Sequence, residues 1–217
     1  MSLEVMHFKS REDWLKARDG IKGIGGSDAA AACGVSKRKT KAQLWKEKTG
    51  RAKPKDLSGV DYVQLGVKIE APMRELFTAF HPELIVEHFP YDIFFQKERP
   101  WCFATLDGAL TDRASGDKGV LEIKKFDVKS RDDWKQWDGR VPDEYFFQVM
   151  HQLSATGYSF SYLWALLRHS DGSCSLREYY FPREEHEDDL AEIMHLERNF
   201  MDFLESGRIP PVNLTLP

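Results

Sequence analysis

Cysteine is scarce in this sequence, and long apolar runs are missing. The three cysteines (Cys33, Cys102 and Cys174) are far apart, odd in number and form no CxxC pair, so we expect a reduced, cytoplasmic protein. Polar residues interrupt every apolar run well before the ~18 positions that a membrane-spanning helix needs. The first residues, MSLEVMHFKSRED, lack the apolar segment of a signal peptide. We therefore predict no membrane partner.

An excess of positive charge is also lacking. The formal net charge is −4, which taken alone disfavours a nucleic-acid-binding protein. The charges are unevenly distributed, however: residues 37–55 contain nine basic residues and one acid, whereas residues 183–205 contain nine acids and two basic residues. The basic run can face phosphates while the acidic run stays in water. Alternatively, both are solvated helix faces. Our DNA-binding candidates are Lys37, Arg38, Lys39 and Lys41.

The remaining composition is that of a globular domain. With 217 residues, of which 41% are hydrophobic, the chain can bury one core. Periodicity, caps and breakers predict helices over residues 8–19, 28–33, 41–50, 62–80, 143–156 and 184–206, with Pro72 kinking the fourth or starting a new segment. They predict strands over residues 84–89, 91–95, 158–168 and 176–181 and a hairpin within 101–127, before an extended tail at 209–217. We expect a single α/β domain with a mixed sheet. It comprises a helical part (1–58), a core (59–182) and a C-terminal helix with its tail (183–217).

The hairpin within residues 101–127 combines acids with a lysine. Asp107 ends its first strand, and the second carries Glu122 and Lys124, which period-2 alternation puts on one sheet face. Adjacent strands lie ~4.8 Å apart, so the two carboxylates can share a metal ion, and hard oxygen ligands suit Mg²⁺. A bound metal would activate water, while a nearby lysine orients that water or stabilises developing charge. The alternative is an exposed hairpin with a cross-strand Lys–Asp pair.

A glycine-rich stretch, GIKGIGGSDAAAACGVS, precedes the second predicted helix. Ser27 or Asp28 is the expected N-cap of that helix. A turn of this kind at a helix N-terminus can bind a phosphate through backbone N–H groups, although it matches neither a Walker loop nor GxGxxG. A tight turn with a capped helix explains the same residues.

Five blocks, in order, resemble a known family. LDG followed by VLEIK is similar to the core signature of the PD-(D/E)xK nuclease superfamily. GIGGSDAAAACGVS, LWKEKTG, the GxxxE spacing from Gly66 to Glu70, and YFFQVMHQLSATGY resemble the YqaJ-type viral recombinases, which are relatives of phage lambda exonuclease. The resemblance implies a restriction-endonuclease-like fold, with a central mixed sheet flanked by helices, acting in a bacterial or phage-infected cell.

Site residues follow from the resemblance by position. It implies that Glu70, Asp107 and Glu122, with the Ile123 carbonyl, bind a pair of Mg²⁺ ions that Mn²⁺ can replace. Lys124 would position the attacking water, and Gln148 would lie near the metals or the terminal phosphate. Arg18, Ser27, Thr105 and Gln148 would line a pocket for the 5′-phosphate. Two departures stand out: Leu106 replaces a frequent proline, and extra residues between Arg18 and Ser27 leave open whether Arg18 or Lys22 binds that phosphate.

The resemblance implies a Mg²⁺-dependent 5′→3′ exonuclease that degrades one strand of linear duplex DNA from phosphorylated ends and leaves a 3′ overhang for recombination. It also implies a ring-shaped homotrimer and a single-strand-annealing partner. The alternatives are a structure-specific or restriction-type endonuclease and a non-catalytic DNA-binding module on a nuclease fold. For His151 we expect packing rather than catalysis, and Trp134 and Trp137 can either stack on bases or close the core.

Overall fold

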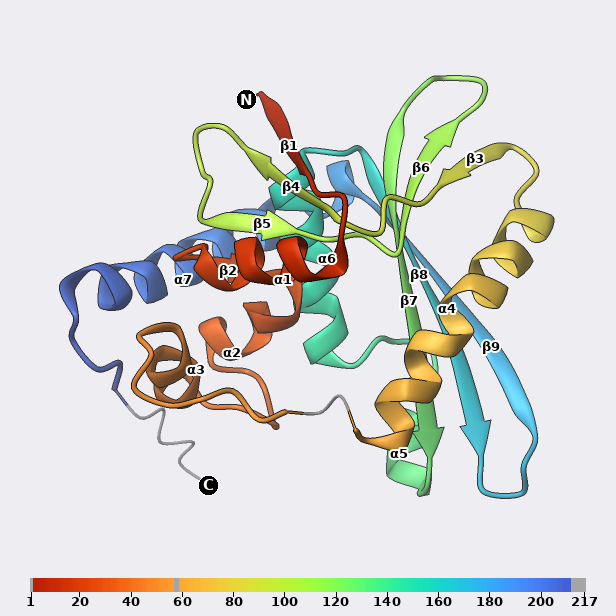
Figure 1. The fold of residues 1–217 in the computed structure, drawn as a ribbon. Helices are drawn as coiled ribbons and strands as arrows, with labels where there is room; N and C mark the ends of the chain where they lie inside the picture. The colour runs from red at the N-terminus through yellow and green to blue at the C-terminus, as the bar shows by residue number, and fades with distance from the viewer. Residues whose placement is uncertain (1, 57–58, 212–217) are drawn as a thin grey trace.

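Two β-sheets form the frame of the protein, seen in a computed structural model that describes residues 2–56 and 59–211 (Figure 1). The four-stranded sheet has the order β1 (Leu3–His7), β4 (Asp92–Gln96), β5 (Cys102–Ala104), β2 (Ile24–Gly25). The five-stranded sheet has the order β3 (Leu84–Glu87), β6 (Gly108–Asp112), β7 (Lys118–Val128), β8 (Phe160–His169), β9 (Cys174–Pro182). Each sheet is mixed, because β2 runs parallel to β5 and β7 parallel to β8. The expected mixed α/β architecture is confirmed, with its strands divided between two sheets.

Most helices begin and end where local signals predict. Ser10 accepts the N–H of Asp13 at the start of α1 (Arg11–Gly20), and Thr40 forms a capping box with Gln43 at the start of α3 (Lys41–Lys48). Gly157, at a positive φ of 73°, ends α6 (Asp143–Thr156). The other helices are α2 (Ala29–Cys33), α4 (Asp61–Phe80), α5 (Arg131–Lys135) and α7 (Glu187–Ser206), with 3₁₀ turns η1 (Gly26–Asp28) and η2 (Arg183–Glu185).

Asp28 is the N-cap residue of α2, as predicted, but its side chain makes no capping hydrogen bond and pairs with Lys48 instead. No new segment starts at Pro72, because α4 is continuous, and a kink at this residue stays a prediction. One strand prediction was wrong. The stretch 101–109 is not one strand: β5 ends at Ala104 and β6 begins at Gly108, in the other sheet. Strands β1 and β2 were not predicted at all, and part of the tail, 212–217, lies outside the described residues.

The core lies around α6, which contacts strands of both sheets and also α2 and α7 (Figure 1). Its buried side chains Val149, Met150 and Leu153 pack with Trp137, which is fully buried. Trp134 is partly buried against this cluster, with the Arg177 guanidinium 4.5 Å from its ring centroid. Both tryptophans therefore close the core. Within the described residues, no helix has the length and apolarity to cross a membrane.

Candidate active site

Asp107 lies where the chain passes from one sheet to the other. It follows β5 and directly precedes β6, whose Gly108 is paired with Leu121 of β7. The Asp107 Oδ2 atom accepts the backbone N–H of Ile123 at 2.8 Å, which fixes the carboxylate against β7. From α4, Arg74 donates to the Asp107 carbonyl oxygen at 2.5 Å. Arg74 thus anchors the backbone of the acid, a role that sequence reasoning missed.

Glu122 is held on both carboxylate oxygens. It is 2% exposed, and its Oε1 atom accepts hydrogen bonds from the Lys124 ammonium and, at 2.6 Å, from Gln148 Nε2. Its Oε2 atom accepts a hydrogen bond from Gln152 Nε2 at 2.6 Å. The structure therefore brings together Glu122, Lys124 and Gln148, as predicted, and adds Gln152. The i, i+4 spacing of the two glutamines on one helix face was the signal for this residue.

The carboxylates repel one another in a partly buried site, in which Glu122 is buried and Glu70 and Asp107 are half-buried. Burial and the charges of Glu122 and Glu70 raise the pKa of Asp107 well above its usual value, against the opposing effects of Lys124 and the Ile123 N–H. Burial and Glu122 likewise raise the pKa of Glu70, on α4, against Arg74 and Lys124. For Lys124, burial lowers the pKa, but Glu122 and Asp107 outweigh it and raise it. The ammonium therefore stays charged and balances only part of the acidic charge.

This surplus of negative charge fits a divalent cation. A cation beside Glu70, Asp107 and Glu122 would remove the repulsion that raises the pKa values of two of them. The available donors are hard oxygen atoms, which Mg²⁺ and Mn²⁺ prefer. These three carboxylates, with the Ile123 carbonyl, remain our predicted ligands.

A second cluster contains Cys102, His151 and Glu197, whose side-chain donor atoms all lie within 4.8 Å of one another. His151 Nδ1 lies 2.7 Å from Glu197 Oε1, and Nε2 lies 2.9 Å from the Phe103 carbonyl oxygen. Both partners are acceptors, so the ring donates from both nitrogens and offers no lone pair to a metal. This fully buried ion pair ties α6 to α7 and β5. His151 does not contact the carboxylates of the site, in agreement with the packing role expected for it.

A pocket of about 450 Å³ lies beside Glu122. Its lining includes the predicted phosphate ligands and the alternative cation Lys22, together with Gln152: Arg18, Lys22, Ser27, Thr105, Gln148, Gln152. The side-chain amides of Gln148 and Gln152 also donate hydrogen bonds to Glu122. These two residues therefore form a wall of the pocket and contact the acidic site at the same time.

The glycine-rich turn forms one side of this pocket because it is anchored to β5. The Ile24 N–H donates to the Trp101 carbonyl oxygen at 2.7 Å, and β2 pairs with β5. A Cβ atom at Gly23 would overlap the Trp101 backbone, so this approach needs glycine. A Cβ at Gly26 would lie 3.4 Å from the Cγ atoms of Gln148 and Gln152, which places the turn directly against α6.

Charges in the pocket are only partly compensated. Asp28 pairs with Lys48 at 2.8 Å, and Glu47 pairs with Lys39 at 2.6 Å. Among the described residues, no ion pair links a carboxylate to Arg18 or Lys22, whose side chains therefore remain available to an anion. The Arg18 guanidinium lies 5.1 Å from the centroid of the Trp14 ring. The structure brings both cations to the pocket, so it leaves open which of them binds a phosphate.

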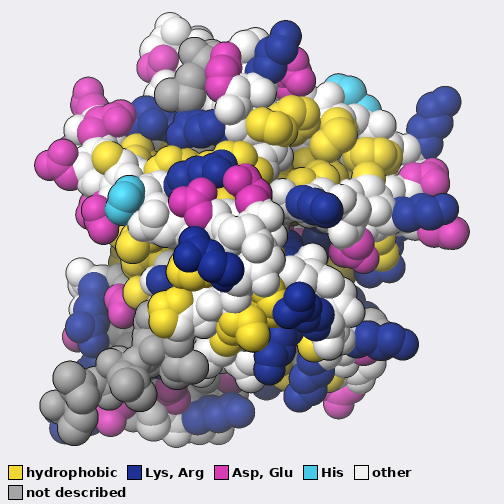
Figure 2. Space-filling view, turned by 90° about the vertical axis from the view of Figure 1, so that its left-hand side faces the viewer, with side chains coloured by type: hydrophobic (Ala, Val, Ile, Leu, Met, Phe, Trp, Pro, Cys, Tyr) yellow, Lys and Arg dark blue, Asp and Glu magenta, His cyan; other side chains and the backbone are white. Residues whose placement is uncertain are grey.

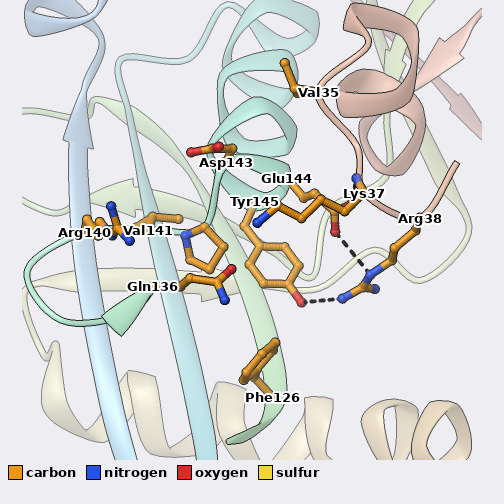
Figure 3. A pocket seen from close by; sticks show the side chains of 11 residues that line it. Val35, Lys37, Arg38, Phe126, Gln136, Arg140, Val141, Asp143, Glu144 and Tyr145 are labelled. Atoms are coloured by element: carbon orange, nitrogen blue, oxygen red, sulfur yellow. Dashed lines mark hydrogen bonds and ion pairs between the residues drawn. The ribbon is translucent and has the colours of Figure 1, made fainter. Parts of the chain in front are cut away.

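The structure divides the basic run. Lys39 lines this pocket and is paired with Glu47, whereas Lys37 and Arg38 line a different cavity, together with Phe126 and Tyr145 (Figure 3). Lys41 is the first residue of α3 and is partly buried. On the face that includes α3 and α7, Lys and Arg side chains form several separate groups with acidic side chains between some of them (Figure 2). DNA contact by the four basic candidates stays a prediction.

Comparison with known proteins identifies the family. Residues 13–159 match the model of the YqaJ-like viral recombinase domain. The chain belongs to this family. The chain is also similar to the uncharacterized protein YqaJ of Bacillus subtilis (strain 168), with 30% identity over 154 residues. The match covers 68% of this chain but 43% of that relative, so the chain spans about two-fifths of its length.

Solved structures agree on the fold. An alkaline exonuclease (LHK-Exo) from Laribacter hongkongensis superposes with a TM-score of 0.62 at 18% identity, over 90% of this chain and 93% of that one. The same exonuclease in complex with dAMP gives a TM-score of 0.57 at 20% identity, with the same coverage. At these identities the likeness shows the fold alone, and it confirms the PD-(D/E)xK architecture expected for a YqaJ-like domain.

Proposed function

We propose that this chain is a single nuclease domain that hydrolyses one strand of linear double-stranded DNA, starting from a 5′-phosphorylated end. The observation that carries the proposal is the wall shared by the cation-lined pocket and the acidic cluster. Gln148 and Gln152 line the pocket and also bind Glu122. A terminal phosphate bound by Arg18 or Lys22 would therefore leave a phosphodiester of the same strand beside the carboxylates. An enzyme arranged in this way releases nucleotides from an end.

The reaction requires a water nucleophile and stabilisation of charge on the phosphate. When bound at Glu70, Asp107 and Glu122, Mg²⁺ would supply water activation and neutralise developing charge. The Lys124 ammonium, held beside Glu122, is positioned to orient the water or to donate to a phosphate oxygen. Gln148 and Gln152 keep the Glu122 carboxylate in place, and the buried setting strengthens each of these interactions.

The proposal extends to a 5′→3′ direction, a remaining 3′ overhang for recombination, a ring-shaped homotrimer and a single-strand-annealing partner. Two kinds of support favour an exonuclease over the alternatives. The family is that of YqaJ-like viral recombinases, and the structural neighbours are named as an alkaline exonuclease, one of them in complex with the mononucleotide dAMP. A decayed, non-catalytic module is disfavoured because Glu70, Asp107, Glu122 and Lys124 are all present.

The deciding experiment compares duplexes that differ only at their ends. A linear duplex with labelled strands, with and without a 5′-phosphate, is incubated with the protein in Mg²⁺ and in EDTA, beside a closed circle. We expect mononucleotides from the phosphorylated 5′-ended strand in Mg²⁺ alone. Equal cleavage of circle and linear duplex would replace exonuclease by endonuclease, and cleavage in EDTA would refute the metal mechanism. Light scattering of the purified protein tests the trimer.

Two variants separate the candidates for the phosphate ligand. We expect either Arg18→Gln or Lys22→Gln to abolish the preference for the phosphorylated end while cleavage of unphosphorylated ends is retained. The other variant, in the same assay, serves as the matched control. If both keep the full preference, the pocket is not the phosphate site.

A further inference from the structure

A second cavity lies at the opposite end of the acidic cluster from the pocket that contains Arg18 and Lys22, which we call the end-phosphate pocket. Along β7, alternate residues Glu122, Lys124 and Phe126 share one face, and α6 runs antiparallel to them. Gln152 and Gln148 contact Glu122, whereas Tyr145, earlier on α6, lies with its ring centroid 5.3 Å from Lys124 Nζ. Lys124 therefore separates the end-phosphate pocket from the space around Phe126.

This second cavity has a volume of about 120 Å³ and a lining of mixed character (Figure 3). Residues contributing to it include Lys37, Phe126, Gln136, Arg140, Val141 and Tyr145. Pockets for drug-sized ligands measure about 300–1,000 Å³, so a cavity of this size suits one small ring system. The rings of Phe126 and Tyr145 provide aromatic faces. Gln136, which donates through Nε2 to the Asp132 carbonyl oxygen at 3.3 Å, keeps its amide oxygen available as an acceptor.

The lining of the cavity contains three cations, Lys37, Arg38 and Arg140, and two acids, Asp143 and Glu144. Glu144 is already engaged by Arg38, with Nε 3.1 Å from its Oε2 atom, and by the Ser36 hydroxyl at 2.8 Å. Arg140 donates to the Lys135 carbonyl oxygen at 3.0 Å and has no carboxylate partner among the described residues. Lys37 is exposed and likewise unpaired within the described part of the chain. A ring bound inside would thus lie beside two unpaired cations. If the ring is the base of a nucleotide, these cations can bind the phosphate of that nucleotide.

We propose that this cavity binds the base of a nucleotide on the far side of the scissile phosphodiester from the end-phosphate pocket. Two residues of strand separate Lys124 from Phe126, or about 6.6 Å, so a base at Phe126 belongs to a nucleotide next to the reacting phosphate. Stacking on an aromatic side chain is tolerant of sequence, which suits an enzyme that advances along any strand. The role as a substrate subsite rests on the proposed function, but base binding itself does not.

The test combines changes in the DNA substrate with changes in the protein and compares kcat/KM for each combination. One duplex carries an abasic nucleotide immediately beyond the scissile bond, and a control duplex carries it several nucleotides further in. Stacking of one base is worth about 5- to 150-fold in binding, so we expect the first abasic duplex to lower kcat/KM of the wild-type protein by this factor. Phe126→Leu keeps most of the packing but loses the aromatic face, so it should slow the intact duplex equally and remove the abasic effect.

Arg140→Gln provides a second variant, independent of the core, and should weaken use of the intact duplex mainly through KM. Lys135→Gln, an exposed neighbour that does not line the cavity, is its matched control. The same abasic comparison is repeated as equilibrium binding of a labelled single-stranded trinucleotide in EDTA. If the protein never cleaves DNA but binds the base-bearing trinucleotide more tightly, the proposed function fails and base binding stands. Cleavage or binding that ignores the abasic change overturns the inference.

Discussion

Replacing Asp107 by Asn should stabilise the protein without metal and abolish its response to metal. Asn keeps the shape of the side chain, and its carbonyl oxygen can still accept the Ile123 N–H. Because burial, Glu122 and Glu70 raise the folded-state pKa of Asp107, the folded protein binds this proton more tightly than the unfolded chain does. Ionised Asp107 therefore lowers stability as pH rises from the unfolded value through the folded one, whereas Asn carries no such penalty.

Bound metal should reverse this difference and make the wild-type protein more stable than Asp107→Asn. A ligand that binds only the folded state at 100 times its dissociation constant adds ~2.7 kcal/mol. For a protein of this length, that corresponds to a rise in melting temperature of roughly 5–11 °C. Wild type should show this rise when Mg²⁺ is titrated, and Asp107→Asn should show little of it. Loss of outer-shell partners of metal ligands already lowers activity by ~10–100-fold, so loss of Asp107 itself should exceed about 100-fold.

The assay is thermal unfolding at pH 8 in EDTA and in a Mg²⁺ series, with nuclease rates measured in parallel. Asp127→Asn, on the same strand, is the matched control. Burial opposes the ionised form of Asp127, but hydrogen bonds from Lys125 and Arg168 lower its pKa, so the control should destabilise the protein equally with and without metal. A lower melting temperature for Asp107→Asn than for wild type in EDTA, or an undiminished Mg²⁺ shift, would refute the electrostatic account of the site.

Two further predictions concern side chains behind the site. Gln152→Leu leaves Glu122 Oε2 without its donor, so kcat should fall by ~10–100-fold, and the unpaired buried carboxylate oxygen should lower the free energy of unfolding in EDTA by ~1–3 kcal/mol; an unchanged rate would remove Gln152 from the site. Glu197→Gln breaks the buried pair with His151 and should lower the free energy of unfolding by ~3–5 kcal/mol. Burial lowers the pKa of His151, but Cys102 and Glu197 outweigh it and raise that pKa well above its usual value. The stability from this pair is thus fully present below the unfolded pKa and lost as pH rises through the folded one. Urea unfolding of wild type and variant across pH checks this, and a difference that grows with pH would contradict it.

Local patterns in the sequence determined much of the secondary structure and the composition of the acidic site. Thr40 and Gln43 specify the start of α3, and Gly157 specifies the end of α6, because capping and positive φ depend on adjacent residues. Period-2 alternation correctly put Glu122 and Lys124 on one face of β7. The five motif blocks, in order along the chain, identified the family, because motifs are compared by sequence alone and need no knowledge of the tertiary structure.

Only the tertiary structure decided how these parts meet. The split of residues 101–109 between two sheets has no strong local signal, because a strand is assigned to a sheet by partners distant in sequence. The same holds for Arg74 on the Asp107 carbonyl and for Gln152 on Glu122. It also holds for His151, whose partner Glu197 lies 46 residues away. The sequence determined which groups of the site were available, and long-range packing determined which of them touch, because contact energies between distant segments leave no periodicity in the chain.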